Sequence, residues 1–376
     1  LNLAAKEGAD LSAGALDLRA RCNELVFGLV DDDALQGQSL AGLQAMGAEE
    51  GATLASTQVD FGAAHEADIG ARMLSLRTGL AGPAIALEGR AIPAASLFGA
   101  GASGGNAGGG MGRWSFFSDA SLGDGDKDAT SVEPGFELDS RSVTAGLDYR
   151  LSESVVVGAA AGYTSLEADL DADGGALDTD SRSLFLYGTW QPSARWYVDG
   201  TLGYTDSDHA QERSLRYGID AAFQDVVVPG IPTLVDQSAR SDNDSREWSA
   251  SLLAGYDHDL GRWVLSPYGR LDHGDVDIDG YTERMADPAA AGHGLAVQID
   301  DQAYQSTTLA LGILAYTDAV LGWGTLVPQL SAEYVHELAN DNDDITGRFV
   351  DAPGGSPDAD FALPTAAPDR DYFNLG

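Results

Sequence analysis

The sequence predicts a mainly β protein, an antiparallel up-and-down β-barrel that crosses a membrane and is preceded by an α-helical region. Three observations predict this fold. Amphipathic segments with a two-residue period fill the second part of the chain, the gaps between them alternate between very short and very long, and tryptophans follow three of the short gaps. A barrel that crosses a membrane back and forth has tight turns on one side and long loops on the other. A soluble sheet has no reason to sort its loops in this way.

The first 80 residues are expected to be helical. Apolar residues have helix-like spacing over 11–47, and Ile69, Met73 and Leu76 then recur at i, i+4 and i+7. Gly79 ends that pattern, and the glycine tract at 99–112 lacks packing side chains, so it marks a domain boundary. The predicted regions are a helical linker region over 1–80, a Gly-rich linker over 81–112 and a barrel region over 113–376.

After the glycine tract, apolar and polar residues alternate, as half-buried strands require. Within 142–151, for example, Val143 and Leu147 alternate with Thr144 and Asp148. We count nine such segments and the start of a tenth: 112–118, 138–151, 153–166, 181–191, 195–206, 246–259, 262–274, 303–318 and 323–338, then 371–376. Since single-chain bacterial barrels have even strand numbers and an edge cannot stay unpaired in lipid, we expect a barrel that is incomplete at its C-terminus.

The two faces of these strands predict two environments. The apolar face is expected to meet lipid, and the polar face to line a hydrated lumen. Both signs of charge occur on the polar face, which favours ion pairs inside the lumen over a single-sign ion filter. The charged residues expected to face the lumen are Asp148, Arg150, Asp199, Asp257, Arg270 and Glu333.

Aromatic residues gather near the strand ends. Trp196, Trp263 and Trp323 each follow a short turn, and Tyr149, Tyr204 and Tyr256 lie near strand ends on the apolar face. Tryptophan and tyrosine rings settle at headgroup depth, so we predict that these aromatics mark a membrane interface. The alternative is that they are ordinary strand aromatics.

Composition narrows the function classes. The net charge of −38 argues against nucleic-acid binding, which needs a positive surface. No window reaches the ~18–20 apolar residues of a membrane helix, so a membrane location requires closed β-structure. The single cysteine, Cys22, excludes a disulfide framework. The acidic long gaps, expected outside the cell, lie at 119–134, 168–182, 206–245, 275–302 and 339–369.

Several stretches carry a family resemblance. They are SVTAGLDYRLSESVVVGAAAGYT at 142–164, SLFLYGTWQPSARWYVDGTLGYTDS at 183–207 and EWSASLLAGYDHDLGRWVLSPYGRLDH at 247–273. Upstream, RCNELV at 21–26 and ADIGARMLSLRTG at 67–79 resemble the helical region that precedes such barrels. The chain resembles the C-terminal translocator domain of bacterial autotransporters, the self-secreting proteins of the type V pathway.

This resemblance implies a barrel of about 12 strands in the outer membrane of a Gram-negative bacterium. It also implies that the barrel delivers an upstream passenger domain to the cell surface, without cofactors or catalysis of its own. The linker would thread the pore, and 81–112 is the candidate segment. The implied partners are outer-membrane lipid, the passenger, the barrel-assembly machinery and periplasmic chaperones. The sequence departs from the family in lacking the last strands and the terminal aromatic residue.

Other motifs keep two rival functions open. Asp169, Asp171, Asp173 and Asp180 have roughly the spacing of a calcium loop, which would suit a soluble acidic extracellular β-protein that binds calcium or acts as an adhesin. His209 and His273 follow Asp208 and Asp272, as in a surface hydrolase site on an outer-membrane barrel. The G-x-S-x-G match at 101–105 lies in a glycine run without the strand and helix that a nucleophile elbow needs.

Overall fold

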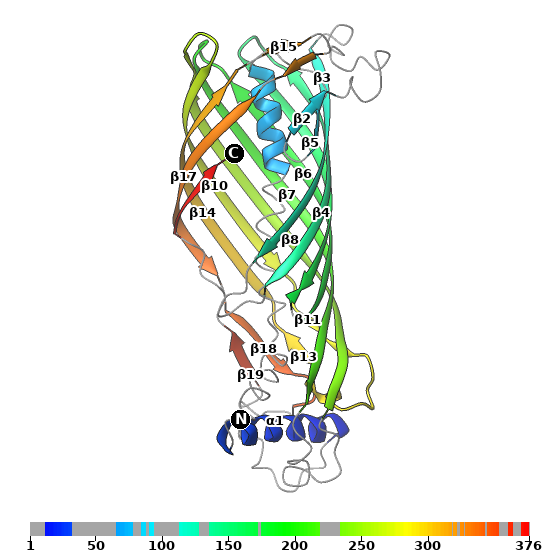
Figure 1. The fold of residues 1–376 in the computed structure, drawn as a ribbon. Helices are drawn as coiled ribbons and strands as arrows, with labels where there is room; N and C mark the ends of the chain where they lie inside the picture. The colour runs from blue at the N-terminus through cyan, green and yellow to red at the C-terminus, as the bar shows by residue number, and fades with distance from the viewer. Residues whose placement is uncertain are drawn as a thin grey trace.

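A computed structural model describes residues 12–31, 65–77, 84–87, 90–93, 113–127, 135–171, 174–218, 234–317, 319–321, 324–326, 328–342, 344–352, 360–363 and 370–375. Its main feature is one antiparallel sheet that curves into a barrel wall (Figure 1). Ten strands follow one another along the sheet in chain order: β3 (Trp114–Lys127), β4 (Phe136–Arg150), β5 (Val155–Leu170), β6 (Gly175–Trp190), β7 (Trp196–Gly218), β8 (Leu234–Tyr256), β10 (Val264–Ile278), β14 (Gln302–Tyr316), β17 (Gln329–Asn342) and β20 (Asp371–Leu375).

The predicted fold class is confirmed. Two short strands, β9 (His258–Asp259) and β12 (Arg284–Met285), pair with β10 and β8 and bring the sheet to twelve strands. The ten strands of the main path correspond to the nine complete segments and the partial tenth segment expected from the sequence. Among the described residues, β3 and β20 form the two ends of the path and are not paired with each other.

Several strands are longer than their alternation of apolar and polar residues predicts. β7 and β8 have 23 residues each and stay paired from Trp196↔Tyr256 to Gly218↔Leu234. Much of the gap expected at 206–245 is therefore ladder rather than loop. A strand needs only ~9–11 residues to cross a membrane, so these strands project well beyond it at the long-loop end. Both faces of the projecting part are rich in polar residues. The alternation of apolar and polar residues that predicts a strand is therefore weak in this part.

The projecting ends carry a small second unit, which we call the cap. It contains the sheet β11 (Tyr281–Thr282), β13 (Val297–Ile299), β18 (Ile345–Phe349) and β19 (Asp360–Leu363), the short helix η5 (His293–Leu295), and the helix α1 (Ala13–Asp31). Figure 1 shows α1 at the far end of the cap, away from the barrel mouth with the short turns. One apolar core joins α1 to the cap and the strand ends: Leu18, Cys22, Leu215, Tyr217, Val235, Ala239, Tyr281, Leu295, Val297, Ile299, Ile345 and Phe349.

A second helix, over residues 65–77, lies inside the barrel near the short-turn end (Figure 1). We call it the lumen helix. Two small hairpins complete the fold: β1 (Ala84–Leu87) with β2 (Arg90–Pro93), and β15 (Ala319–Leu321) with β16 (Gly324–Leu326). No helix in the described part of the chain is long and apolar enough to span a membrane.

Polar and apolar residues are sorted between the two sides of the wall. Exposed apolar side chains surround the barrel, among them Leu147, Leu184, Leu202, Leu252 and Leu311. Buried hydroxyl groups line its interior, among them Ser142, Thr144, Thr164, Ser183 and Thr205. An apolar exterior around a polar interior is the arrangement of a membrane barrel and the inverse of a soluble one.

Candidate functional site

The lumen and its helix form the most elaborate site in the described structure. The predicted apolar stripe of the helix packs against the wall, because Ile69 and Met73 join an apolar cluster with Phe117, Phe185 and Tyr187. The opposite face of the helix carries Ala67 and Ala71, which stay exposed in the lumen. The stripe predicted from sequence therefore contacts the inside of the barrel rather than another helix.

The first turn of the lumen helix is tied to two strands through one histidine. Nδ1 of His65 lies 2.8 Å from the hydroxyl of Thr144 on β4, and Nε2 lies 2.9 Å from the hydroxyl of Thr164 on β5. The same Thr144 hydroxyl donates to Asp68 at 2.7 Å. A side chain at Gly162 would place its Cβ 2.6 Å from the His65 ring, so the ring needs a glycine at that point of the wall.

The middle of the helix is held by a buried ion pair. Nε of Arg72 donates to Asp148 at 2.9 Å, a second guanidinium nitrogen also contacts that carboxylate, and both side chains are almost fully buried. Tyr187 donates its hydroxyl to the other oxygen of Asp148, and Ser115 donates to the carboxylate at 3.0 Å. A buried charge is tolerated only when it is paired and hydrogen-bonded, and this carboxylate satisfies both conditions.

The C-terminal turn repeats this arrangement on another strand. Arg77 forms a buried ion pair with Asp199 on β7, and its guanidinium lies 3.7 Å from the ring centroid of Tyr197. Five residues separate the two arginines, which places them about 140° apart around the helix axis. Because they bind β4 and β7 in different directions, together they fix both the rotation and the depth of the helix.

The other charged residues that were expected in the lumen differ in their burial and in their partners. Glu333 is buried and accepts from Arg270 at 2.9 Å and from Tyr268 at 2.8 Å, which joins two wall strands. Asp257 is partly buried, and Arg150 is exposed at the end of β4. The pairing of Asp148 and Asp199 with the helix was not predicted, because nothing in the sequence around Arg72 and Arg77 points to these two strands. The sequence did contain one indication of these pairs. Two carboxylates lie on strand faces that become buried, and each buried carboxylate needs a cation beside it.

Among the predicted interface aromatics that the structure describes, Tyr149, Trp196, Tyr256 and Trp263 lie at the short-turn end, whereas Tyr204 lies eight residues further along β7, across from Trp248. Trp196 and Trp263 are 56% and 46% exposed, and Trp323 lies outside the described residues. Trp114 and Trp190, which the sequence reasoning passed over, are exposed near the same end.

The catalytic alternative finds no geometric support in the described residues. His209 is buried between Thr179 and Ser245, whereas its neighbour Asp208 is exposed and pairs with Arg182. Adjacent residues on a strand point to opposite faces, so neither this pair nor Asp272 with His273 forms an Asp/His dyad. The G-x-S-x-G segment at 101–105 lies outside the described residues.

The calcium alternative rests on a hairpin that the structure describes only in part. Asp169, Asp171 and Asp180 are exposed, Asp173 lies outside the described residues, and Asp180 accepts a hydrogen bond from Tyr163 at 2.6 Å. In the described part of the chain, no three acidic, histidine or cysteine side chains gather in a way that could hold a metal ion. Calcium binding stays a prediction.

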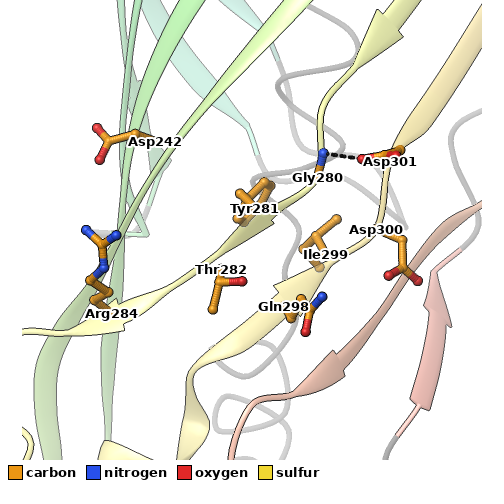
Figure 2. A pocket seen from close by; sticks show the side chains of 9 residues that line it. All are labelled: Asp242, Gly280, Tyr281, Thr282, Arg284, Gln298, Ile299, Asp300 and Asp301. Carbon is orange, nitrogen blue, oxygen red and sulfur yellow. Dashed lines mark hydrogen bonds between the residues drawn. The ribbon is translucent and has the colours of Figure 1, made fainter.

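A separate hollow of about 510 Å³ lies between β8 and the cap (Figure 2). Its lining is mostly polar, with Asp242 and Arg284 on one side and the cap strands β11 and β13 with their flanking residues on the other: Gly280, Tyr281, Thr282, Gln298, Ile299, Asp300 and Asp301. The side chain of Asp301 accepts a hydrogen bond from the backbone amide of Gly280 at 2.8 Å, and this bond fixes the turn into β11. This hollow is an open junction between two parts of the fold.

Comparisons with known proteins agree with this geometry. A family model described as "Autotransporter beta-domain" matches residues 116–376. The chain is 28% identical to "Esterase EstA" of Pseudomonas aeruginosa, over 62% of this chain and 32% of that protein. It is 26% identical to "Putative uncharacterized protein YaiT" of Escherichia coli, over 57% of this chain and 20% of that protein. The chain thus spans between a fifth and a third of the length of these relatives.

Two solved structures are similar. The translocator domain of autotransporter NalP from Neisseria meningitidis superposes with a TM-score of 0.49 and 15% identity, over 77% of this chain and 84% of that one. The β domain of the Bordetella autotransporter BrkA superposes with a TM-score of 0.41 and 17% identity, over 63% of this chain and 83% of that one.

Proposed function

The chain belongs to the autotransporter β-domain family, and from this premise we propose that its barrel exports a passenger domain, joined upstream of α1, to the cell surface. As a family member it is an outer-membrane translocator, and the translocator domain is not itself catalytic. The passenger determines any further activity. The esterase name of one relative belongs to that whole protein.

One observation carries the proposal. The lumen helix lies between α1 at the cap end and β3, which starts at the short-turn end, and it is bound to the wall by the Arg72–Asp148 and Arg77–Asp199 pairs. A chain that has passed through the barrel towards the cap would leave its trailing segment in this position. The hydroxyl-lined wall offers hydrogen bonds to a passing backbone, and the ion pairs form when the two arginines arrive.

This path implies an orientation. The cap and the acidic long loops lie outside the cell, and the short turns lie in the periplasm. The sequence pointed to 81–112 as the segment that threads the pore, whereas under this proposal the lumen helix over 65–77, within the linker region 1–80, is the segment that stays in the lumen. The charged residues predicted to face the lumen then divide into helix partners, such as Asp148, and wall partners, such as Glu333. Barrel-assembly machinery and periplasmic chaperones are the partners that the family implies.

Surface display tests the proposal. An epitope placed upstream of Leu1 in the full-length protein is expected to bind antibody on intact cells and to be lost when those cells are treated with external protease. The matched control carries the same epitope within the short turn after Pro192 and stays hidden until the outer membrane is opened. An upstream epitope that remains hidden although the barrel is folded, as judged by its heat-dependent gel mobility, contradicts the proposal.

A further inference from the structure

Three arginine–tryptophan pairs mark the short-turn end of the barrel. Arg113-Trp114, Arg195-Trp196 and Arg262-Trp263 each lie at the start of a strand, β3, β7 or β10. Three of the six tryptophans thus follow an arginine, in a chain with only 21 basic residues. We call these six residues the Arg-Trp rim.

Two of the pairs are built in the same way. The guanidinium of Arg113 lies 5.3 Å from the ring centroid of Tyr149, and that ring lies 4.7 Å from the ring of Trp114. Arg195 donates to the hydroxyl of Tyr256 at 3.1 Å, and the ring of Tyr256 lies 5.1 Å from that of Trp196. In both cases the tyrosine lies directly across from the tryptophan on the neighbouring strand. The repeat holds a guanidinium against an aromatic pair on the outer surface of the wall.

The arginines of the rim have no carboxylate partner within the part of the chain that the structure describes. Among the described residues, none of Arg113, Arg195 and Arg262 has a carboxylate within ion-pair distance, and all three are exposed. Arg113 is also held in place, because its Nε donates to the carbonyl oxygen of Arg150 at 2.7 Å. Asp259, on the same short turn as Arg262, accepts a hydrogen bond from the backbone amide of Gly261 at 2.7 Å instead. The lumen arginines, by contrast, each bind a buried carboxylate.

Exposed tryptophan and tyrosine rings settle at headgroup depth. The guanidinium groups beside them therefore lie at the level of the lipid phosphates, and a guanidinium binds phosphate through two parallel hydrogen bonds. We propose that the Arg-Trp rim binds the phosphate groups of anionic phospholipids, such as phosphatidylglycerol, in the inner leaflet of the outer membrane. This inference rests on the proposed function, which places the short turns at that leaflet.

The strong negative charge of the protein as a whole limits any preference for anionic lipid to the three rim arginines. A net charge of −38 repels anionic lipid in general, so any local enrichment must come from individual cationic sites. A basic residue at a membrane surface enriches an anionic lipid on the order of fivefold. Three separate sites at one end of the barrel give a measurable effect without a change in the overall charge balance.

Quenching of tryptophan fluorescence by brominated lipids tests the proposal, because bromine quenches only rings that it touches. The full-length protein is reconstituted in phosphatidylcholine vesicles in which a minor fraction is brominated phosphatidylglycerol or, in a parallel sample, brominated phosphatidylcholine. We expect several-fold stronger quenching by the brominated phosphatidylglycerol. The variant R113Q/R195Q/R262Q is expected to lose this difference.

The matched control is R182Q/R216Q/R240Q, which removes three exposed, carboxylate-paired arginines from the long-loop end and makes the same change in net charge. It should keep the preference. Equal quenching by the two brominated lipids in the wild-type protein overturns the inference, as does loss of the preference in the control variant.

Two further measurements distinguish failed insertion or failed folding from the absence of a lipid site. Flotation with the vesicles reports insertion, so a wild-type protein that does not float contradicts the proposed function rather than the lipid site. If the triple variant does not fold, the single variants R113Q, R195Q and R262Q are measured, and each should lose part of the preference. Single variants that all keep the full preference would overturn the inference.

Discussion

Replacing Arg72 with alanine is expected to loosen the lumen helix. The substitution leaves the carboxylate of Asp148 buried without its cation, and breaking a buried ion pair in this way costs about 3–5 kcal/mol. Ser115 and Tyr187 still donate to that carboxylate, which places the loss near the lower limit, about 3 kcal/mol. This free energy corresponds to a roughly 100-fold larger population of the state in which the helix has left the wall.

Amide hydrogen exchange measures this population directly, because helix amides exchange only from the opened state. In the R72A variant, exchange over 65–77 should accelerate on the order of 100-fold, while the amides of β4 and β7 keep their rates. The matched control is R182A, which breaks an exposed pair with Asp208 and should change exchange in the helix by no more than a few-fold.

A double replacement separates the ion pair from simple loss of packing. In R72M/D148L both charges are replaced by apolar side chains of similar length, a change that is often neutral for a buried pair. Protection of the helix should return most of the way to the wild-type value. If R72A changes exchange in the helix less than about threefold, the ion pair does not hold the helix and the reasoning is wrong.

Three further predictions concern the cap and the wall. A Cβ at Gly294 would lie 2.2 Å from the carbonyl oxygen of Gly14, so G294A should detach α1, seen as faster proteolysis of that helix. Burial raises the pKa of the Cys22 thiol to about 11. The free energy of unfolding should therefore fall as the pH rises from 9 to 11, because the unfolded chain loses its thiol proton first. A thiol reagent at pH 8 should label Cys22 only after unfolding, and rapid labelling of the native protein would contradict the packing around it. A Cβ at Gly158 would lie 2.3 Å from the Tyr187 ring, so G158A should lower the melting temperature, whereas G274A, with open space around it, should not.

The barrel was predictable because each wall strand meets lipid on one side and polar side chains on the other. Val143 and Leu147 are exposed while Thr144 and Asp148 are buried, as the alternation predicts. The strand ends beyond the membrane carry no such contrast. The stretch of β7 from Ser207 to Arg213 is mostly polar on both faces, so it resembled a loop.

The partners of the lumen charges were not predictable from local pattern. Asp148 is separated by 76 residues from Arg72, and Asp199 by 122 residues from Arg77. Neither spacing carries a signal, because the pairs form only when the helix lies against the inside of the barrel wall. The cap was missed for the same reason, since its core joins α1 to short strands within the gaps expected to be loops.

In the proposed path, the chain crosses the barrel from the periplasmic short turns to an external cap. Single cysteines at Ser12, beside α1, and at Ser193, in the turn before β7, test it in a C22A background; both positions are exposed. Intact cells are treated with a maleimide reagent too large to cross the outer membrane. We expect labelling at position 12 in intact cells, and labelling at position 193 only after the membrane is opened. Labelling at position 193 and protection at position 12 would contradict it.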